Sequence, residues 1–274
     1  MRLTEQQSEK LLSYAKSFNV DRSLAKRMIE MAERSVREWE CEHGMFLTPV
    51  ESGCLLKVVR AIPEVWATSW GGYDDAERCV IVCCHEDMVE SESTVLDGIA
   101  DNFVVVKLLG DFSGGKVRHG DFLGAVLHGA GLKRECIGDV MVLEERGAQV
   151  IATRQGGEII SQSVSQVANV KVEAQLASLK ELEAVERRTK QITSVENSLR
   201  IDAVLSGGLG TSRTKMSELC ASGLVRRNYA ELRSASKSVQ RGDVLSVRGL
   251  GKIRVDDWSE TRKGRFRVTM TRFI

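Results

Sequence analysis

The stretch SLRIDAVLSGGLGTSRTKMSELCASGLVRRNYAELRSASKSVQRGDVLSV, residues 198–247, decides the fold of the C-terminal part of the chain. An apolar-periodic run begins at residues 200–202, and the pair Gly207-Gly208 is expected to stop it. Ser212 stands where a second helix needs its N-cap. The pattern therefore predicts a short helix, a glycine break and a second helix from Arg213 to about Ser222.

Helical spacing also orients the predicted second helix. One face collects three apolar residues, Met216, Leu219 and Cys220. Arg213 and Lys215 lie off that face, so the basic start of the helix is expected to point away from the core. After the helix, an extended segment over 224–228 is expected to return as a second strand over 243–247.

The charges of the sequence are unevenly distributed. Residues 187–274 hold 19 Lys and Arg against 8 Asp and Glu, a net charge of +11, whereas the rest of the 274-residue chain holds 20 against 30, a net charge of −10. A compact basic module attracts polyanions by releasing their counterions, while an acidic part suits folding or protein contacts. The length allows two or three domains.

The order of these signals resembles the S4 RNA-binding domain. Its family pattern combines Arg-Leu-Asp, a Ser-Arg helix start, Gly-x-Val-x-Val-Asn and a late Gly-Asp turn, and the matching residues are Arg200, Asp202, Ser212, Arg213, Gly223, Val225, Asn228, Gly242 and Asp243. Three positions depart from it: Ile201 replaces the usual Leu, Arg227 stands where the family buries a Val, and Tyr229 where a Gly is common. The resemblance implies an RNA face formed by Arg200, Ser212, Arg213, Lys215, Arg226, Arg227 and Asn228, with Lys237, Arg241 and Lys252 at its rim.

The preceding part of the chain alternates between helix and strand signals. Two helices are predicted over 4–18 and 21–42, with Asp21 as the N-cap of the second. Further along, a helix is expected over 49–61 and another over 121–130, and strands over 65–70, 79–84, 103–109, 140–143 and 148–153. The segment 176–198 is polar and is expected to be a linker, with the Arg187-Arg188 pair as a candidate phosphate contact. These signals predict an α+β fold with helices on sheets.

Four segments of this part, FLTPVESGCLLKVVRAIPEV, WGGYDDAER, RHGDFLGAVLHGAGLKRECIGDVMV and RGAQV, resemble the YlmH family of bacteria, cyanobacteria and plastids. The resemblance runs from about Phe46 to the end of the chain. The helix signals place an N-terminal helical region over 1–45. The resemblance implies a central α/β plait of RRM type over 46–186 and an S4 domain with C-terminal strands over 187–274. It also implies that the plait contacts RNA, and the candidate residues are Lys116, Arg118, His119, Lys133 and Arg134.

The segment GDFSGGKV, residues 110–117, nearly fits the phosphate-binding loop G-x-x-x-x-G-K-[ST]. It lies between a predicted strand and a predicted helix, as that motif requires. Val117 replaces the hydroxyl residue that would bind magnesium, so a glycine-rich connection whose Lys116 and Arg118 face RNA is favoured over a nucleotide site.

Two other candidate sites have simpler explanations. Cys79, Cys83, Cys84 and His85 lie in a strand whose adjacent residues point to opposite faces, which favours buried thiols over a zinc site. His119 beside Asp121 has the composition of a general base and its orienting carboxylate, but Asp121 also suits a helix cap. For His119 a hydrogen bond to RNA is preferred, and neither a metal nor a cofactor is expected.

The residue types also limit the cellular compartments in which the protein is expected. Seven scattered cysteines without disulfide spacing suit a reducing intracellular compartment, and no apolar run approaches the length of a membrane span. The expected location is a bacterial-type cytoplasm, or an organelle stroma or matrix if a transit peptide was removed, with the chloroplast favoured over the mitochondrion.

The sequence therefore predicts a non-enzymatic protein that binds structured RNA, either rRNA or tRNA, through shape and phosphate contacts. The family resemblance implies association with the large ribosomal subunit in translation, ribosome assembly or the rescue of stalled complexes that carry peptidyl-tRNA. Two alternatives stay open. One is an RNA-modifying or nucleotide-dependent enzyme with an active site in residues 46–155, and the other is an assembly factor whose acidic part binds protein while its basic end holds RNA.

Overall fold

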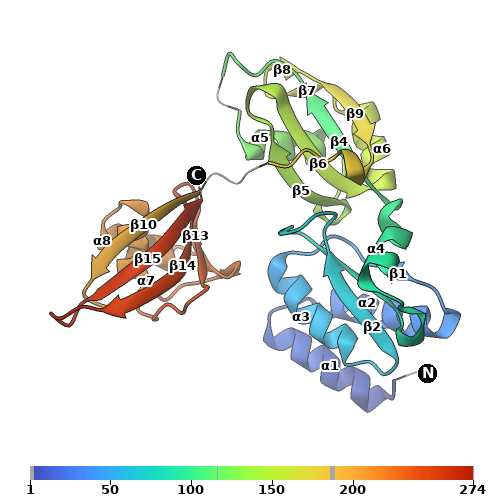
Figure 1. The fold of residues 1–274 in the computed structure, drawn as a ribbon, viewed down its shortest axis with the longest axis horizontal. Coiled ribbons are helices and arrows are strands. Elements are labelled where there is room, and N and C mark those ends of the chain that lie inside the picture. The colour runs from blue at the N-terminus through green and yellow to red at the C-terminus, as the bar shows by residue number, and fades with distance from the viewer. Residues whose placement is uncertain (1–2, 116, 186–188, 274) are drawn as a thin grey trace. The chain divides into compact units, whose positions relative to one another are not determined.

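The computed structural model describes residues 3–115, 117–185 and 189–273, and the chain forms two compact units, Met1–Val185 and Glu186–Ile274. Both units combine helices with β-sheets, so the predicted α+β class is confirmed. The ribbon shows the elements of each unit (Figure 1). Of the helices in these described residues, none has both the length and the apolar character that crossing a bilayer needs.

The first unit begins with three helices and a small sheet, with α2 and α3 against the sheet and α1 against these two helices. The helices are α1 (Glu5–Ser17), α2 (Arg22–Glu38) and α3 (Pro49–Arg60). The sheet has the order β1-β3-β2, with β1 (Glu42–His43), β2 (Val65–Trp70) and β3 (Val80–His85). Asp21 caps α2 as predicted, because its side chain accepts the backbone N–H groups of Ser23 and Leu24. One apolar core joins Leu12 in α1 to Cys83 in β3, so the domain boundary expected at residues 45/46 falls inside it.

The second part of this unit is an α/β plait, as the sequence resemblance implied. Its four strands and two helices follow in the order β4 (Phe103–Leu109), α5 (His119–Gly124), β5 (Ile137–Val142), β6 (Gly147–Thr153), α6 (Arg154–Ser163) and β9 (Glu173–Ala177). All neighbours in the sheet order β5-β6-β4-β9 are antiparallel. Apolar residues such as Val104, Val106 and Ile160 form the core on the helix side of this sheet.

Shorter elements complete the first unit. Helix α4 (Glu92–Ala100) connects the two parts, and a π-helical turn, η2 (Ala125–Gly129), extends α5. The remaining elements are the strand pair β7 (Gln166–Val167) and β8 (Val170–Lys171) and four 3-10 turns, η1 (Glu86–Met88), η3 (Arg134–Cys136), η4 (Glu144–Arg146) and η5 (Leu179–Glu181).

The second unit packs two helices on one face of a six-stranded sheet. The helices are α7 (Ile201–Leu209) and α8 (Arg213–Ala221). The sheet order is β10-β15-β14-β13-β11-β12, and the strands are β10 (Thr189–Glu196), β11 (Val225–Arg227), β12 (Ala230–Glu231), β13 (Val244–Val247), β14 (Gly251–Glu260) and β15 (Phe266–Phe273). One apolar core joins both helices to β10, β11, β13, β14 and β15.

The first predicted helix of this unit is longer than expected. The pair Gly207-Gly208 does not stop α7, which ends at Gly210, where φ is +69°. A Cβ on Gly207 would lie 2.7 Å from the Cβ of Ser194 in β10. The glycines therefore allow close packing of α7 on the sheet, and the helix stops at a left-handed residue further along.

The expected linker over 176–198 is also largely ordered. It contains the end of β9, the turn η5 and the strand β10, which pairs with β15 along its whole length. The residues of β10 had been expected to form a linker because they are largely polar. The polar residues Thr189, Gln191 and Thr193 lie on the outer face of this edge strand. Arg187 and Arg188 lie outside the described residues.

The hairpin between β5 and β6 requires a glycine at residue 147. Gly147 has φ +130°, and an added Cβ would lie 1.9 Å from the backbone oxygen of Leu108. The variant Gly147→Ala is expected to lower the free energy of unfolding by about 2 kcal/mol or more, measured by urea denaturation. Gly114→Ala is the matched control, because open space surrounds that Cβ position and its stability should change by less than about 0.5 kcal/mol. Equal urea midpoints for the two variants would contradict the requirement for a glycine at residue 147.

Candidate nucleic-acid interface

The start of α8 presents the first group of predicted residues. Ser212 is the N-cap, and its hydroxyl accepts the backbone N–H of Lys215 at 3.3 Å, as the sequence predicted. Arg213 and Lys215 are exposed. A helix N-terminus carries partial positive charge, so the two cations and the helix end attract an anion from the same side.

A buried carboxylate fixes the arginines beside this helix start. Asp202 is 4% exposed. Its oxygens accept two hydrogen bonds from Arg200, at 3.1 and 2.8 Å, and one from Arg213 at 3.4 Å. Burial by itself would raise the pKa of Asp202, but the hydrogen bonds and charge of Arg200, with the charge of Arg213, outweigh it and lower that pKa. Arg200 and Arg213 are therefore held in fixed positions, with their side chains still half-exposed.

A second buried carboxylate explains the presence of Arg227 where the S4 pattern has a Val. Asp243, 3% exposed, pairs with Arg227 at 2.7 Å and accepts the side-chain amide of Asn228 at 2.9 Å. Asn228 and Tyr229 have φ of +50° and +69°, so they form the tight turn of the β11–β12 hairpin. Tyr229 thus occupies a conformation that favours glycine. Arg227 and Asn228 both bond within the fold, Arg227 from a partly buried position and Asn228 from an exposed one.

Other predicted cations line the outer face of the sheet or the turns beside it. Strand register places Arg226, Ser246, Lys252 and Phe273 in one row across β11, β13, β14 and β15. The Lys252 ammonium lies 4.6 Å from the ring centre of Phe273. Arg241 stacks at 4.7 Å over Trp258 and pairs with Asp257. Among the predicted cations in the described part of this unit, three exposed ones form no ion pair: Lys215, Arg226 and Lys237.

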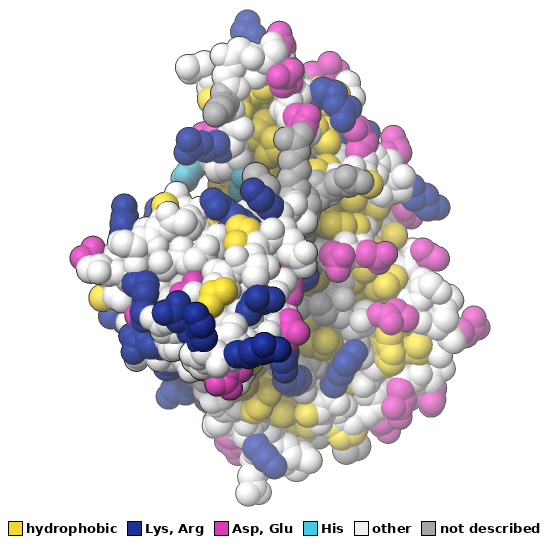
Figure 2. All heavy atoms as spheres, turned by 60° about the vertical axis from the view of Figure 1, so that its left-hand side comes forward, with side chains coloured by type: hydrophobic (Ala, Val, Ile, Leu, Met, Phe, Trp, Pro, Cys, Tyr) yellow, Lys and Arg dark blue, Asp and Glu magenta, His cyan; other side chains and the backbone are white. Residues whose placement is uncertain are grey.

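Lys and Arg side chains gather on the surface of this unit, in agreement with its charge of +11 over residues 187–274 (Figure 2). Because the predicted residues come from the helix start, the β11–β12 turn and the sheet, the basic surface extends over both sides of the unit. Among the described predicted cations, the residues that are best placed to meet an anion are the exposed and unpaired Lys215, Arg226 and Lys237, together with Arg213, which Asp202 holds at the helix start.

The predicted residues of the plait divide into exposed and internally bonded groups. Arg118, His119 and Lys133 are exposed, and Lys116 lies outside the described residues. Arg134 donates to the backbone oxygens of Ile137 and Gly138, at 2.5 and 2.9 Å. Burial, and then the charge of Arg78, lowers the pKa of Arg134 to about 10. Arg134 therefore stabilises the entry to β5, and an RNA contact by it stays a prediction.

The other polar groups around Arg134 come from the segments that carried the family resemblance. Asp139 accepts the Tyr73 hydroxyl and the backbone N–H of Glu77, both at 2.7 Å. Arg78 donates to the backbone oxygens of Phe46, at 2.7 Å, and Ile137, at 3.1 Å. These bonds join the segments WGGYDDAER and LKRECIGDV, so two of the segments that resemble the family meet in one polar junction. The sequence alone missed Arg78 and Asp139, because nothing in their spacing shows that they meet.

The general-base and zinc alternatives gain no geometric support from the described residues. Asp121 accepts the backbone N–H of Arg118 at 2.7 Å, as a residue of the first turn of α5. Desolvation of the imidazole ring by nearby protein groups and then the charge of Arg134 lower the pKa of His119, although the residue keeps an exposed surface. Burial raises the pKa of Cys83 to about 12, which disfavours the thiolate that a zinc site needs. In the described residues, no group of three His, Cys, Asp or Glu side chains is placed to hold a metal.

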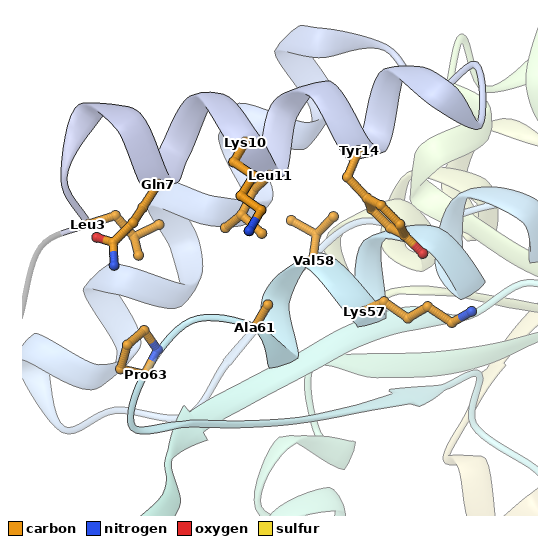
Figure 3. A pocket seen from close by; sticks show the side chains of 9 residues that line it. All are labelled: Leu3, Gln7, Lys10, Leu11, Tyr14, Lys57, Val58, Ala61 and Pro63. Atoms are coloured by element: carbon orange, nitrogen blue, oxygen red, sulfur yellow. The ribbon is translucent and has the colours of Figure 1, made fainter.

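One groove lies apart from all of these residues. It has a volume of about 360 Å³, and its lining side chains come from α1, from α3 and from the turn after α3 (Figure 3). Its wall is largely apolar, with Lys10, Lys57 and Tyr14 among the lining residues. Since it contains none of the predicted RNA-binding residues, it is a separate feature of the first unit.

The fold and the surface define the class of this protein: an α+β protein that joins a plait to a basic module of two helices on a sheet. Two family models match the chain, "YlmH, N-terminal" over residues 20–88 and "Putative RNA-binding domain in YlmH" over residues 111–181. The chain belongs to the YlmH family.

One relative and one solved structure accompany this assignment. The chain is 30% identical over 233 residues to the ribosome-associated protein quality control protein P2 of Bacillus subtilis, which covers 83% of this chain and 85% of the relative. The structure of the cell division protein ylmH from Streptococcus pneumoniae superposes with a TM-score of 0.49 at 15% identity, covering 60% of this chain and 94% of the other.

The two neighbouring arginines in β11 allow a test of the structural role of Arg227. Arg227→Met is expected to lower the free energy of unfolding by about 2 kcal/mol, because it leaves the buried Asp243 carboxylate without its cation. Arg226→Met, on the same strand, removes an exposed side chain and should change stability by less than about 0.5 kcal/mol. Urea midpoints of the C-terminal unit measure both. Equal losses would contradict a structural role for Arg227.

The lowered pKa of Asp202 predicts a pH dependence. Its ion pairs contribute stability that is present above the pKa of an unfolded Asp, about 4, and that is lost as the pH falls through the lower folded value. The stability difference between the wild type and Asp202→Asn should therefore narrow below about pH 4. Urea midpoints measured from neutral to acidic pH check this. A difference that stays constant would show that the charge of Asp202 contributes nothing.

Proposed function

We propose that this protein binds structured RNA, either rRNA or tRNA, through the C-terminal unit, and that it does so without catalysing a reaction. One observation carries the proposal. At the start of α8 the N-cap Ser212, the exposed Lys215 and the Asp202-bound Arg213 are arranged on a unit with a large positive charge. Fixed cations and backbone donors of this kind recognise the shape of an RNA helix without reading base edges.

The family assignment supports the proposal. A model that is described as an RNA-binding domain matches the plait, and a relative is named as a ribosome-associated quality control protein. The order of the elements from α7 to β13 agrees with the S4-type resemblance of residues 198–247. We infer that the protein associates with the large ribosomal subunit, in translation, in assembly or in the rescue of stalled complexes. The proposed compartment is a bacterial-type cytoplasm or an organelle stroma.

Reversing the charge of the α8 start should weaken RNA binding and reduce its dependence on salt. Lys215→Glu is the preferred variant, because the Lys215 ammonium forms no ion pair with the described residues. The slope of log Kd against log salt should fall by about one unit for each phosphate that the variant no longer binds. Fluorescence anisotropy with a tRNA transcript at several salt concentrations measures both quantities.

Lys171→Glu is the matched control for this experiment, since Lys171 is an exposed lysine of β8 in the other unit. It changes the net charge equally, and it should leave the affinity and the slope near those of the wild type. Equal effects of the two variants would show that RNA binding depends only on the net charge of the protein. Co-sedimentation of the wild type and Lys215→Glu with purified large ribosomal subunits tests the ribosomal part of the proposal, and turnover of RNA with a methyl donor or a nucleotide would overturn the non-catalytic part.

A further inference from the structure

The sheet of the plait has a second face that points away from its helices. Along β4, Val104 and Val106 belong to the helix-side core, so Lys107 points to the opposite face. Near Phe103 that face packs against the first part of the unit. Around Lys107, residues 178–183, here called the strap, lie against it and lead to the end of the unit at Val185 (Figure 1).

The strap is held by polar contacts at the centre of the sheet. Lys107 on β4 and Gln149 on β6 are direct partners in the strand register. The Glu183 carboxylate pairs with Lys107 at 3.4 Å and with Arg146 at 2.9 Å. The Gln149 side chain donates to the Glu183 backbone oxygen at 3.0 Å and accepts the Glu183 backbone N–H at 2.8 Å. Glu183 is therefore recognised both by its charge and by its amide.

This pair of contacts has the chemistry of nucleotide recognition. A lysine and an arginine that hold a carboxylate can equally hold a phosphate. A glutamine amide that donates one hydrogen bond and accepts another matches the N7 and N6 groups of adenine. In single-stranded RNA such base edges are free to be read on the surface of a sheet.

We propose that the strap occupies a binding site for single-stranded RNA, with Gln149 reading an adenine and with Lys107 and Arg146 holding the adjacent phosphate. In the closed state Glu183 takes the place of that nucleotide. Displacement of the strap opens the site. This site lies on the plait, and it is separate from the proposed RNA interface of the C-terminal unit.

Two features favour a removable cover. Gln149 is fully buried at the centre of the face, where a permanent contact would be expected to place apolar side chains. The two leucines that attach the strap, Leu179 and Leu182, are only partly buried. The strap also ends next to residue 186, where the C-terminal unit begins, so RNA held by that unit is tethered by the chain to the covered site.

The test uses the full chain and two short probes of equal length, fluorescein-labelled oligoadenylate and oligouridylate. Glu183→Gln and, separately, Leu179→Asp with Leu182→Asp should release the strap, which hydrogen exchange at its backbone amides reports. Each should tighten oligoadenylate binding about tenfold and oligouridylate binding much less. Adding Lys107→Gln should remove the gain, and adding Gln149→Met should remove the preference for adenine.

Glu90→Gln is the matched control, because it removes an exposed carboxylate of the same unit away from the strap and should leave oligoadenylate binding unchanged. Faster amide exchange in the strap without tighter oligoadenylate binding overturns the proposal and leaves the face as a protein contact. A gain that survives Lys107→Gln but disappears with Lys215→Glu also overturns it, because the RNA would then lie on the C-terminal unit. A gain that persists with Lys215→Glu supports it even if the function proposed for that unit fails.

Discussion

The C-terminal unit depends on one electrostatic constraint: cations that crowd a small surface repel one another, so the arginines that must keep a position need a carboxylate inside the fold. Asp202 supplies it for Arg200 and Arg213, and Asp243 supplies it for Arg227. Both carboxylates are almost fully buried and are satisfied by further hydrogen bonds. Because each acid binds side chains from different elements, the same contacts that orient the basic surface also join α7 to α8 and β11 to the turn before β13.

Elements with a strong local signal could be predicted from the sequence. The strands over Val65–Trp70 and Phe103–Leu109 have the predicted limits, and Asp21 and Ser212 are N-caps as expected. Helix α6 was missed because the glycine pair in its first turn resembles a loop. A Cβ on Gly157 would lie 2.2 Å from a methyl group of Val104, so that glycine permits close packing on the sheet. Such a requirement comes from a distant strand and leaves no local signal.

The candidate site was predictable as a set of charges but not as a surface. Lys215 and Arg226 are exposed as expected, whereas Arg134 and Arg227 bind groups of the protein itself. A sequence shows which residues can bind an anion. Which of them the fold already uses depends on partners such as Asp243, sixteen residues after Arg227 in the chain and adjacent to it in space. The unusual Arg227 is thus explained by a long-range partner.

On the covered face of the plait, too, residues that can bind an anion are already bonded to a group of the protein. Solvent-accessible ion pairs contribute only about 0.2–1 kcal/mol each. The bond of Glu183 to the exposed Arg146 is of this kind, and the bond to Lys107 is only partly buried, so the two hold the strap weakly compared with a buried apolar contact. The partly buried leucines of the strap add a contribution of similar order. When the closed state is more stable than the open state by a few kcal/mol, roughly 0.1–10% of the molecules are open. A ligand that supplies both a phosphate and an adenine edge replaces the polar contacts of the strap without leaving Gln149 unsatisfied. Because each lost hydrogen bond is replaced, displacement of the strap by such a ligand is thermodynamically accessible.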